Sequence, residues 1–147
     1  MRGFRFGWNQ FEFEVEFSDS NGLGGVCVGR PRPDQQQIWV DGSVSEALKK
    51  TAVLHEFLHC VSDLCLLRLS EEQVTRLSVC LPSYLSDAPF TEARAREAVG
   101  HVNRRQRLRL GRSVTGIVEA LVSLACGAPE VVSWMFLKGP VPENPQM

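Results

Sequence analysis

The chain has 147 residues, of which 44% are hydrophobic and 22% are charged, and its formal net charge is −1. This length is typical of one domain that buries a substantial core, and the composition is that of a globular protein. A net charge close to zero provides no overall attraction to nucleic acid or to an anionic membrane. These bulk properties exclude binding that is driven by overall charge alone.

Residues 4–17 alternate between apolar and polar side chains, which predicts two β-strands with one aromatic inner face. The apolar positions are Phe4, Phe6, Trp8, Phe11, Phe13, Val15 and Phe17. A hairpin is expected near residues 7–10, and Glu12, Glu14 and Glu16 are interpreted as a solvated strand face. The stretch has no continuous apolar region and no small-residue cleavage site, so it is not predicted to be a signal peptide.

A second pair of strands is predicted at residues 26–28 and 37–40, so that the N-terminal strands form a small antiparallel sheet. The loop between them, residues 29–34, contains two prolines, which cannot join a hydrogen-bonded ladder. The glycine-rich turn at residues 21–25 lacks the following Lys-Ser/Thr of a phosphate loop. Nucleotide binding is therefore not expected.

Residues 51–65, TAVLHEFLHCVSDLC, contain His55 and His59 at a spacing of four. At this spacing two imidazoles project from one face of a helix and can share one small cation. Glu56 lies about 100° further round the helix than His55, and from there its carboxylate can reach a water molecule held by the cation. This is the His-Glu-x-x-His arrangement of zinc hydrolases.

The helix that carries this motif is predicted to be buried. Ser43 and Glu46 are interpreted as a capping box at its start, and apolar residues occupy every side of it from Ala52 to Leu69. Two imidazoles in a dry core need partners, which a metal ion supplies. The alternative interpretation is a pair of hydrogen-bonded core histidines.

A second helix is predicted to begin at Ser70, directly after a short link at Arg68 and Leu69, with Gln73 completing a capping box, and to end near Leu85. The stretches LHEFLHCVSD and LSEEQVTRLSVCL together resemble the ImmA/IrrE-like zinc metallopeptidases, which are gluzincins, and especially their short versions in phages and mobile elements. In that family, an acidic residue on the helix after the His-Glu-x-x-His motif completes a His-His-Glu site.

The resemblance places this third ligand at Glu71. Val74 and Thr75 stand where the family often has Ala and Asn, so Glu72 is kept as the alternative ligand. The structural interpretation of both glutamates is compensation of the helix dipole in a first turn.

The resemblance implies an α+β fold, with a zincin-like metallopeptidase core at residues 1–88 and a helical C-terminal extension at residues 89–147 packed on it as a single folded unit. It implies Zn²⁺ held by His55, His59 and Glu71, with a fourth position for water whose pKa falls towards about 7. Glu56 would be the general base. The implied substrate is a protein or peptide, such as a repressor, which could add to an edge strand at residues 37–40.

Other polar residues are candidates for supporting roles at the same site. Asp63 lies one turn after His59 and could orient a ligand histidine from the second coordination shell. Tyr84 and His101 are the only tyrosine and the only further histidine, and either could help to hold an oxyanion. Cys60 is expected to point away from the metal.

Three further helices are predicted in the second half of the chain. One starts at Thr91, with Phe90 as a staple residue, and runs towards Leu110. A core helix at residues 113–126 and a short helix at residues 131–137 follow, and residues 139–147 form a tail. No stretch reaches the roughly 18 uninterrupted apolar residues of a spanning helix, so no membrane partner is expected.

The charge is unevenly distributed along the chain. Residues 101–147 hold six Lys/Arg and three Asp/Glu, a net charge of +3, whereas residues 1–100 hold ten and fourteen, a net charge of −4. The basic excess lies in Arg104, Arg105, Arg107, Arg109 and Arg112. Such a face is more often a solvated surface than a contact for nucleic acid or an acidic partner.

Two alternatives to a peptidase stay open: a zinc-binding protein with a structural or interaction role, and a DNA-associated or virion-associated interaction protein.

The five cysteines are odd in number and lack Cys-x-x-Cys spacing. They are predicted to be buried thiols in a reducing, cytoplasmic compartment rather than a disulfide framework. They are Cys27, Cys60, Cys65, Cys80 and Cys126.

Overall fold

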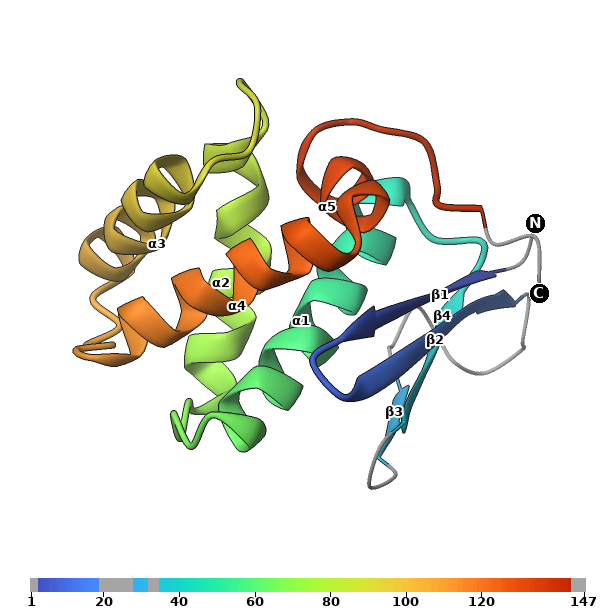
Figure 1. Cartoon of the computed structure of the whole chain (residues 1–147), viewed down its shortest axis with the longest axis horizontal. Helices are drawn as coiled ribbons and strands as arrows, with labels where there is room; N and C mark the ends of the chain where they lie inside the picture. The colour runs from blue at the N-terminus through green and yellow to red at the C-terminus, as the bar shows by residue number, and fades with distance from the viewer. Residues whose placement is uncertain (1–2, 19–27, 32–34, 144–147) are drawn as a thin grey trace.

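The computed structural model describes residues 3–18, 28–31 and 35–143, and it has an α+β fold in which a sheet is followed by helices (Figure 1). The strands are β1 (Gly3–Trp8), β2 (Phe11–Ser18), β3 (Val28–Pro31) and β4 (Gln35–Asp41). The helices are α1 (Glu46–Leu64), α2 (Glu71–Leu85), α3 (Glu92–Gln106), α4 (Ser113–Gly127) and α5 (Pro129–Phe136). The predicted α+β class, with strands first and helices after them, is confirmed. The glycine-rich turn at residues 21–25 and the last residues of the predicted tail, 144–147, lie outside the described part.

The sheet has the strand order β1-β2-β4-β3. It is mixed, whereas an antiparallel sheet was predicted. β1 and β2 form the expected antiparallel hairpin, and β3 and β4 are also antiparallel. β2 and β4 run parallel, with Glu12 opposite Gln35 and Ser18 opposite Asp41. The alternation of side chains identifies the two faces of a strand, but it contains no information on the direction of its neighbours.

The second strand pair differs from its predicted boundaries, because β3 continues through Gly29 and Arg30 to Pro31, which lies opposite Gln36. Proline is tolerated there because β3 is at the edge of the sheet. β4 is paired on both sides, by β2 and by β3. The prediction that residues 37–40 form an edge strand open to an extended substrate is therefore wrong.

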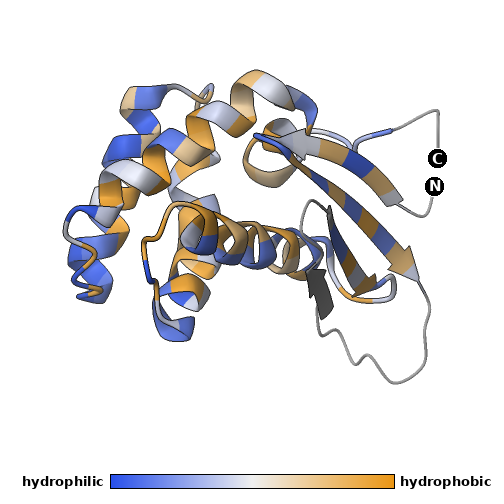
Figure 2. Cartoon of the chain, turned by 60° about the horizontal axis from the view of Figure 1, so that its bottom comes forward, coloured by the Kyte–Doolittle hydropathy of each residue, from blue (hydrophilic) through white to orange (hydrophobic). Residues whose placement is uncertain are grey.

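One face of the sheet is aromatic and packs against helices, whereas the other face is polar. Figure 2 shows this alternation as orange and blue bands along the hairpin strands. On the inner face, Phe57 of α1 lies edge-on to Trp8, with ring centroids 5.3 Å apart, and Trp134 of α5 lies edge-on to Phe4 at 5.4 Å. On the outer face, Glu14 pairs with Arg5 at 3.4 Å. The glutamates of β2 lie on the polar face, as predicted.

Helix α1 begins two residues later than predicted. Ser45 is the N-cap, and its Oγ accepts a hydrogen bond from the backbone N–H of Leu48. Ser43 instead donates from its backbone N–H and its hydroxyl to Asp41 Oδ1, at 2.9 and 2.7 Å. Both serines satisfy the preference for a short polar N-cap residue. Ser43 is bonded to Asp41 in the preceding turn, which leaves Ser45 as the N-cap.

Helix α1 also ends earlier than predicted, at Leu64 rather than just before the expected link at Arg68 and Leu69. The backbone N–H of Leu67 returns to the carbonyl of Ser62 at 2.9 Å, which closes the last turn in the manner of a Schellman motif. Leu66 has a φ of 55° and is 78% exposed. The sequence offers no glycine or proline at this point, so the apolar pattern gave no sign of a stop.

The remaining helices lie close to their predicted positions, with α3 ending at Gln106 rather than near Leu110. Buried side chains of the sheet and of all five helices form one hydrophobic cluster, which joins residues before and after position 88. Among the described residues, no single helix is long and apolar enough to cross a membrane, and α4 and α5 reach that length only as a pair bent by 117°.

The cysteines are only partly as predicted. Cys60, Cys65, Cys80 and Cys126 are free thiols, and Cys60 is buried. Cys65 and Cys126 are exposed, because one follows the end of α1 and the other lies on the outer side of the last turn of α4. Cys27 lies outside the described residues.

Replacing Phe57 with alanine should test how α1 is held against the sheet. Phe57 is fully buried between the rings of Trp8 and Phe13, so Phe57→Ala should lower the free energy of unfolding by about 3–5 kcal/mol. The control is Leu66→Ala at a side chain that is 78% exposed, which should change it by less than about 0.5 kcal/mol. Urea unfolding followed by circular dichroism measures both. Equal effects of the two substitutions would contradict this packing.

Candidate metal centre

Helices α1 and α2 bring three ligand-type side chains together. His55 and His59 lie one turn apart on α1, and Glu71 is the first residue of α2. The link between the two helices, residues 65–70, is fixed by Ser62, whose Oγ accepts a hydrogen bond from the backbone N–H of Leu69 at 2.8 Å. This short link turns the start of α2 back onto the face of α1 that carries the histidines.

The start of α2 is held by the predicted capping box. Ser70 Oγ accepts from the backbone N–H of Gln73 at 3.0 Å, and Gln73 Oε1 accepts from the backbone N–H of Ser70 at 2.8 Å. Gln73 also donates from its Nε2 to the carbonyl of Leu108 at 2.7 Å. Glu71 lies between these two residues, so its backbone position is fixed by the cap.

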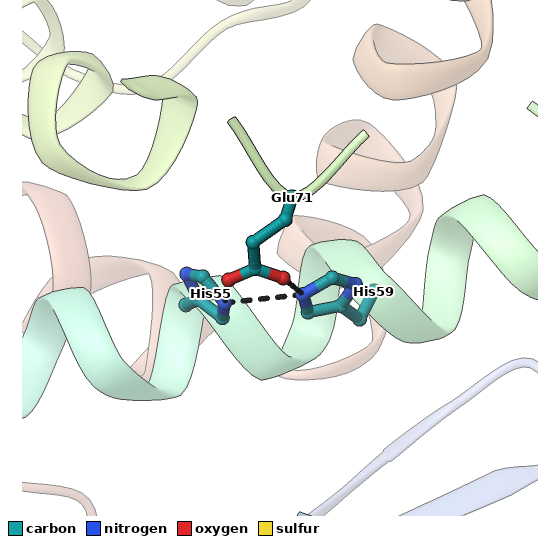
Figure 3. Close-up of side chains that lie close together, drawn as sticks. All are labelled: His55, His59 and Glu71. Atoms are coloured by element: carbon teal, nitrogen blue, oxygen red, sulfur yellow. Dashed lines mark hydrogen bonds and ion pairs between the residues drawn. The ribbon is translucent and has the colours of Figure 1, made fainter. Parts of the chain in front are cut away.

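The three side chains converge on one point, as Figure 3 shows. His55 Nε2 lies 2.9 Å from one carboxylate oxygen of Glu71, and His59 Nε2 lies 2.7 Å from the other. The two Nε2 atoms are 3.1 Å apart. Two ring nitrogens and a carboxylate therefore form a group that could hold a metal ion.

These distances fit a small tetrahedral cation. Ligand atoms about 2.0–2.1 Å from a tetrahedral metal are separated from one another by about 3.3 Å. The two Nε2 atoms are 3.1 Å apart, and each lies 2.7–2.9 Å from a different oxygen of the Glu71 carboxylate; with one atom taken from each residue, the three donors lie within 4.8 Å of one another. The donor set is the His₂Glu type that leaves a fourth position to solvent or substrate.

The electrostatics of the cluster favour an ionised Glu71. Desolvation raises the pKa of this carboxyl, but the charges and hydrogen bonds of His55 and His59 outweigh that effect and hold the pKa below its usual value. The Glu71 side chain is 69% exposed, and those of His55 and His59 are 20% and 33% exposed. The cluster is therefore accessible from solvent, and Glu71 stays a carboxylate at neutral pH.

Glu56 lies beside the cluster in sequence, directly after His55 on α1, and it is half-buried. The helix places it on a different side from His55, which keeps its carboxylate out of the ligand set.

Glu72, the alternative third ligand, is not part of the cluster. Its Oε1 accepts a hydrogen bond from Arg76 Nε at 3.1 Å, one turn further along α2. Glu71 and Glu72 are about 100° apart on the helix, so only one of them can face α1. Of the two glutamates, Glu71 is the one that the structure places beside the histidines.

The predicted supporting residues are not at the cluster. Asp63 is exposed, and no hydrogen bond within the described ranges joins it to His55 or His59. Tyr84 and His101 stack on each other, with ring centroids 4.6 Å apart, and both line a separate cavity of about 160 Å³. Tyr84 is near the end of α2 opposite to Glu71, about 20 Å along the helix axis. The structure therefore does not bring Asp63, Tyr84 or His101 together with the three ligand-type side chains.

Cys60 is also outside the ligand set. It is buried, and this burial, with a smaller contribution from the charge of Asp63, raises the pKa of its thiol to about 11. A thiol rather than a thiolate is present at neutral pH, and only the thiolate binds metal well.

Ser62 and the second hydrogen bond of Gln73 are the parts of the site that sequence reasoning missed. Ser62 is only 4% exposed although it is polar, and it fixes the α1–α2 link. Ser62 lies one turn after Leu58 on the buried side of the helix. This position indicates only weakly that its hydroxyl forms a buried hydrogen bond. The partner of Gln73, Leu108, is 35 residues away, and no local pattern identifies such a contact.

Comparisons of the chain with family models, with curated proteins and with solved structures return no match. The resemblance to ImmA/IrrE-like metallopeptidases thus stays a prediction.

Metal binding should depend on Glu71 and not on Glu72. Glu71→Gln removes an anionic ligand and should weaken binding of Zn²⁺, used here as the probe, by more than about 100-fold. Glu72→Gln removes the same charge from the next residue, which is bonded only to Arg76 among the described contacts, and should leave affinity nearly unchanged. Competition against a chromophoric chelator measures both. Equal losses in the two variants would contradict the assignment of the ligand.

Proposed function

We propose that this protein is a zinc-dependent metallopeptidase that hydrolyses peptide bonds of a protein substrate. The observation that carries the proposal is the convergence of His55, His59 and Glu71 at 2.7–3.1 Å, with Glu56 next to His55. Two imidazoles and one carboxylate are a donor set of catalytic zinc sites, whereas structural zinc sites usually close the fourth position with another Cys or His.

Solvent access to the cluster supports a catalytic rather than a structural role. The Glu71 side chain is largely exposed and both imidazoles are partly exposed. A purely structural metal gains nothing from an open side, while a hydrolase needs one for water and for the scissile bond.

The residues of the chain have distinct roles in this mechanism. His55, His59 and Glu71 would hold zinc, which supplies Lewis acidity by lowering the pKa of water to about 7 and by polarising a carbonyl. Glu56 accepts a proton from the attacking water and delivers it to the leaving amine. Because β4 is paired on both sides, an extended substrate that adds a strand would have to use the edge strands β1 or β3.

The Glu56→Gln variant separates catalysis from metal binding. It keeps the size of the side chain but removes the base, so it should bind zinc like the wild type while its rate of peptide hydrolysis falls by about 10²–10⁴-fold. The substrates are fluorescently labelled unfolded casein and a mixed peptide library, and Glu72→Gln is the control with the same change in charge.

Two outcomes would contradict the proposal. One is the absence of cleavage by the zinc-loaded wild type of any library peptide, which would favour the zinc-binding protein without peptidase activity. The other is cleavage by Glu56→Gln at the wild-type rate, which would remove Glu56 from the mechanism.

A further inference from the structure

The turn between α3 and α4 carries a dense group of positive charges. We call residues 104–112 the arginine loop. Five of its nine residues are arginines, and all five are exposed: Arg104, Arg105, Arg107, Arg109 and Arg112. In the described part of the chain none of them takes part in an ion pair. Five guanidinium groups thus face solvent with their charge uncompensated.

The arginine loop has a fixed conformation. Arg107 and Arg109 adopt left-handed backbone angles, with φ of 52° and 57°, a conformation that residues other than glycine seldom adopt. Leu108 and Leu110 alternate with them and are only 6% and 5% exposed. Asn103 secures the turn, because its Oδ1 accepts from the backbone N–H of Leu110 at 3.0 Å. The buried leucines therefore force the intervening arginines outwards in a set arrangement.

The arginine loop packs directly on the elements that form the metal cluster. The carbonyl of Leu108 accepts from Gln73, two residues after Glu71 in the first turn of α2, at 2.7 Å. Next to it, Arg76 Nη1 of α2 donates to Gln106 Oε1 at 2.7 Å. Figure 1 shows the α3–α4 turn and the start of α2 at the same end of the molecule. Gln73 is about 200° round the helix from Glu71, so the arginine loop and the cluster border opposite sides of the same first turn of α2, and an extended peptide that passes this turn could reach both.

We propose that the arginine loop binds an acidic stretch of the protein substrate and so places a neighbouring peptide bond at His55, His59 and Glu71. This inference rests on the proposed peptidase function. Arginine pairs with carboxylates through two parallel hydrogen bonds, and several arginines in a fixed arrangement select for a run of Asp and Glu.

Charge distribution favours an acidic peptide over nucleic acid as the partner. The sequence pI is about 6.3, whereas nucleic-acid-binding domains typically have a pI above about 9 and a basic stripe along a whole face. Outside the loop the chain is acidic, with a net charge of −4 over residues 1–100, which repels a long polyanion. A basic patch confined to nine residues matches a short acidic segment.

The test measures binding without cleavage. Zinc-loaded Glu56→Gln protein is titrated with a fluorescent peptide that contains six Asp/Glu, and anisotropy is recorded at low and at physiological salt. Adding Arg107→Gln and Arg109→Gln should weaken binding by about tenfold and reduce its salt dependence. The matched control, Arg96→Gln with Lys138→Gln, removes two exposed positive charges elsewhere and should bind within about twofold of the parent.

A second pair of substitutions guards against local unfolding of the loop. Arg104 and Arg105 lie in the last turn of α3, where glutamine fits the helix, and Arg104→Gln with Arg105→Gln should have the same effect on binding with an unchanged melting temperature. Unaltered affinity in both loop pairs would overturn the proposal. Tighter binding of a single-stranded oligonucleotide of equal charge would overturn it in favour of nucleic acid.

Cleavage assays distinguish failure of this inference from failure of the proposed function. With a functional Glu56, the library should be cut preferentially near acidic runs, and the loop variants should lose that preference while they retain activity on neutral peptides. Cleavage without any acidic preference would overturn the role of the loop but leave the peptidase intact. Arginine-dependent peptide binding by a protein that cuts nothing would instead overturn the peptidase, and with it the role of the loop in substrate placement.

Discussion

The contact of one carboxylate, Glu71, with two imidazoles, His55 and His59, is the interaction on which the account of this protein depends. It joins two helices that are consecutive in the chain, and the link of residues 65–70 leaves little freedom in how they cross. The contact forms because α1 stops at Leu64 and because the capping box at Ser70 starts α2 at once. A helix α1 that continued to Leu69 would move Glu71 away from both histidines.

The rest of the fold holds α1 in place while it leaves the histidines accessible. Phe57, between His55 and His59 in sequence, is buried against the aromatic face of the sheet. The same helix thus has one side in the core and one side at the surface, and the ligands lie at the boundary. The resulting rigidity suits a site whose ligands must keep their positions before a metal arrives.

Local chemistry was sufficient to predict much of this arrangement. The capping box at Ser70 and the meeting of His55 and His59 on one side of α1 depend on neighbouring residues, and both were predicted correctly. The aromatic alternation of β1 and β2 likewise identified the hairpin and its buried face. The predictions that were wrong concern contacts between residues that are distant in sequence. The parallel pairing of β2 with β4 and the remote cavity that contains Tyr84 and His101 are consequences of topology, which no local pattern records.

The position at which α1 ends was predicted wrongly for a different reason. The turn after Leu64 is made by hydrogen bonds to the carbonyl and hydroxyl of Ser62 and by left-handed angles at Leu66 and Arg68, residues that carry no recognisable stop signal. The error of a few residues in the end of α1 did not affect the choice of Glu71 as the third ligand. That choice depended on the resemblance and on the predicted start of α2. The side of α2 that faces α1 then excluded Glu72.

X-ray absorption at the zinc edge of the zinc-loaded protein reports which atoms surround the metal. We expect two nitrogen scatterers at about 2.0–2.1 Å, one carboxylate oxygen at about 2.0–2.2 Å and a further light atom, with imidazole multiple scattering from two rings. A sulfur scatterer at about 2.3 Å, or a spectrum that is unchanged when Glu71 is replaced by glutamine, would contradict this expectation.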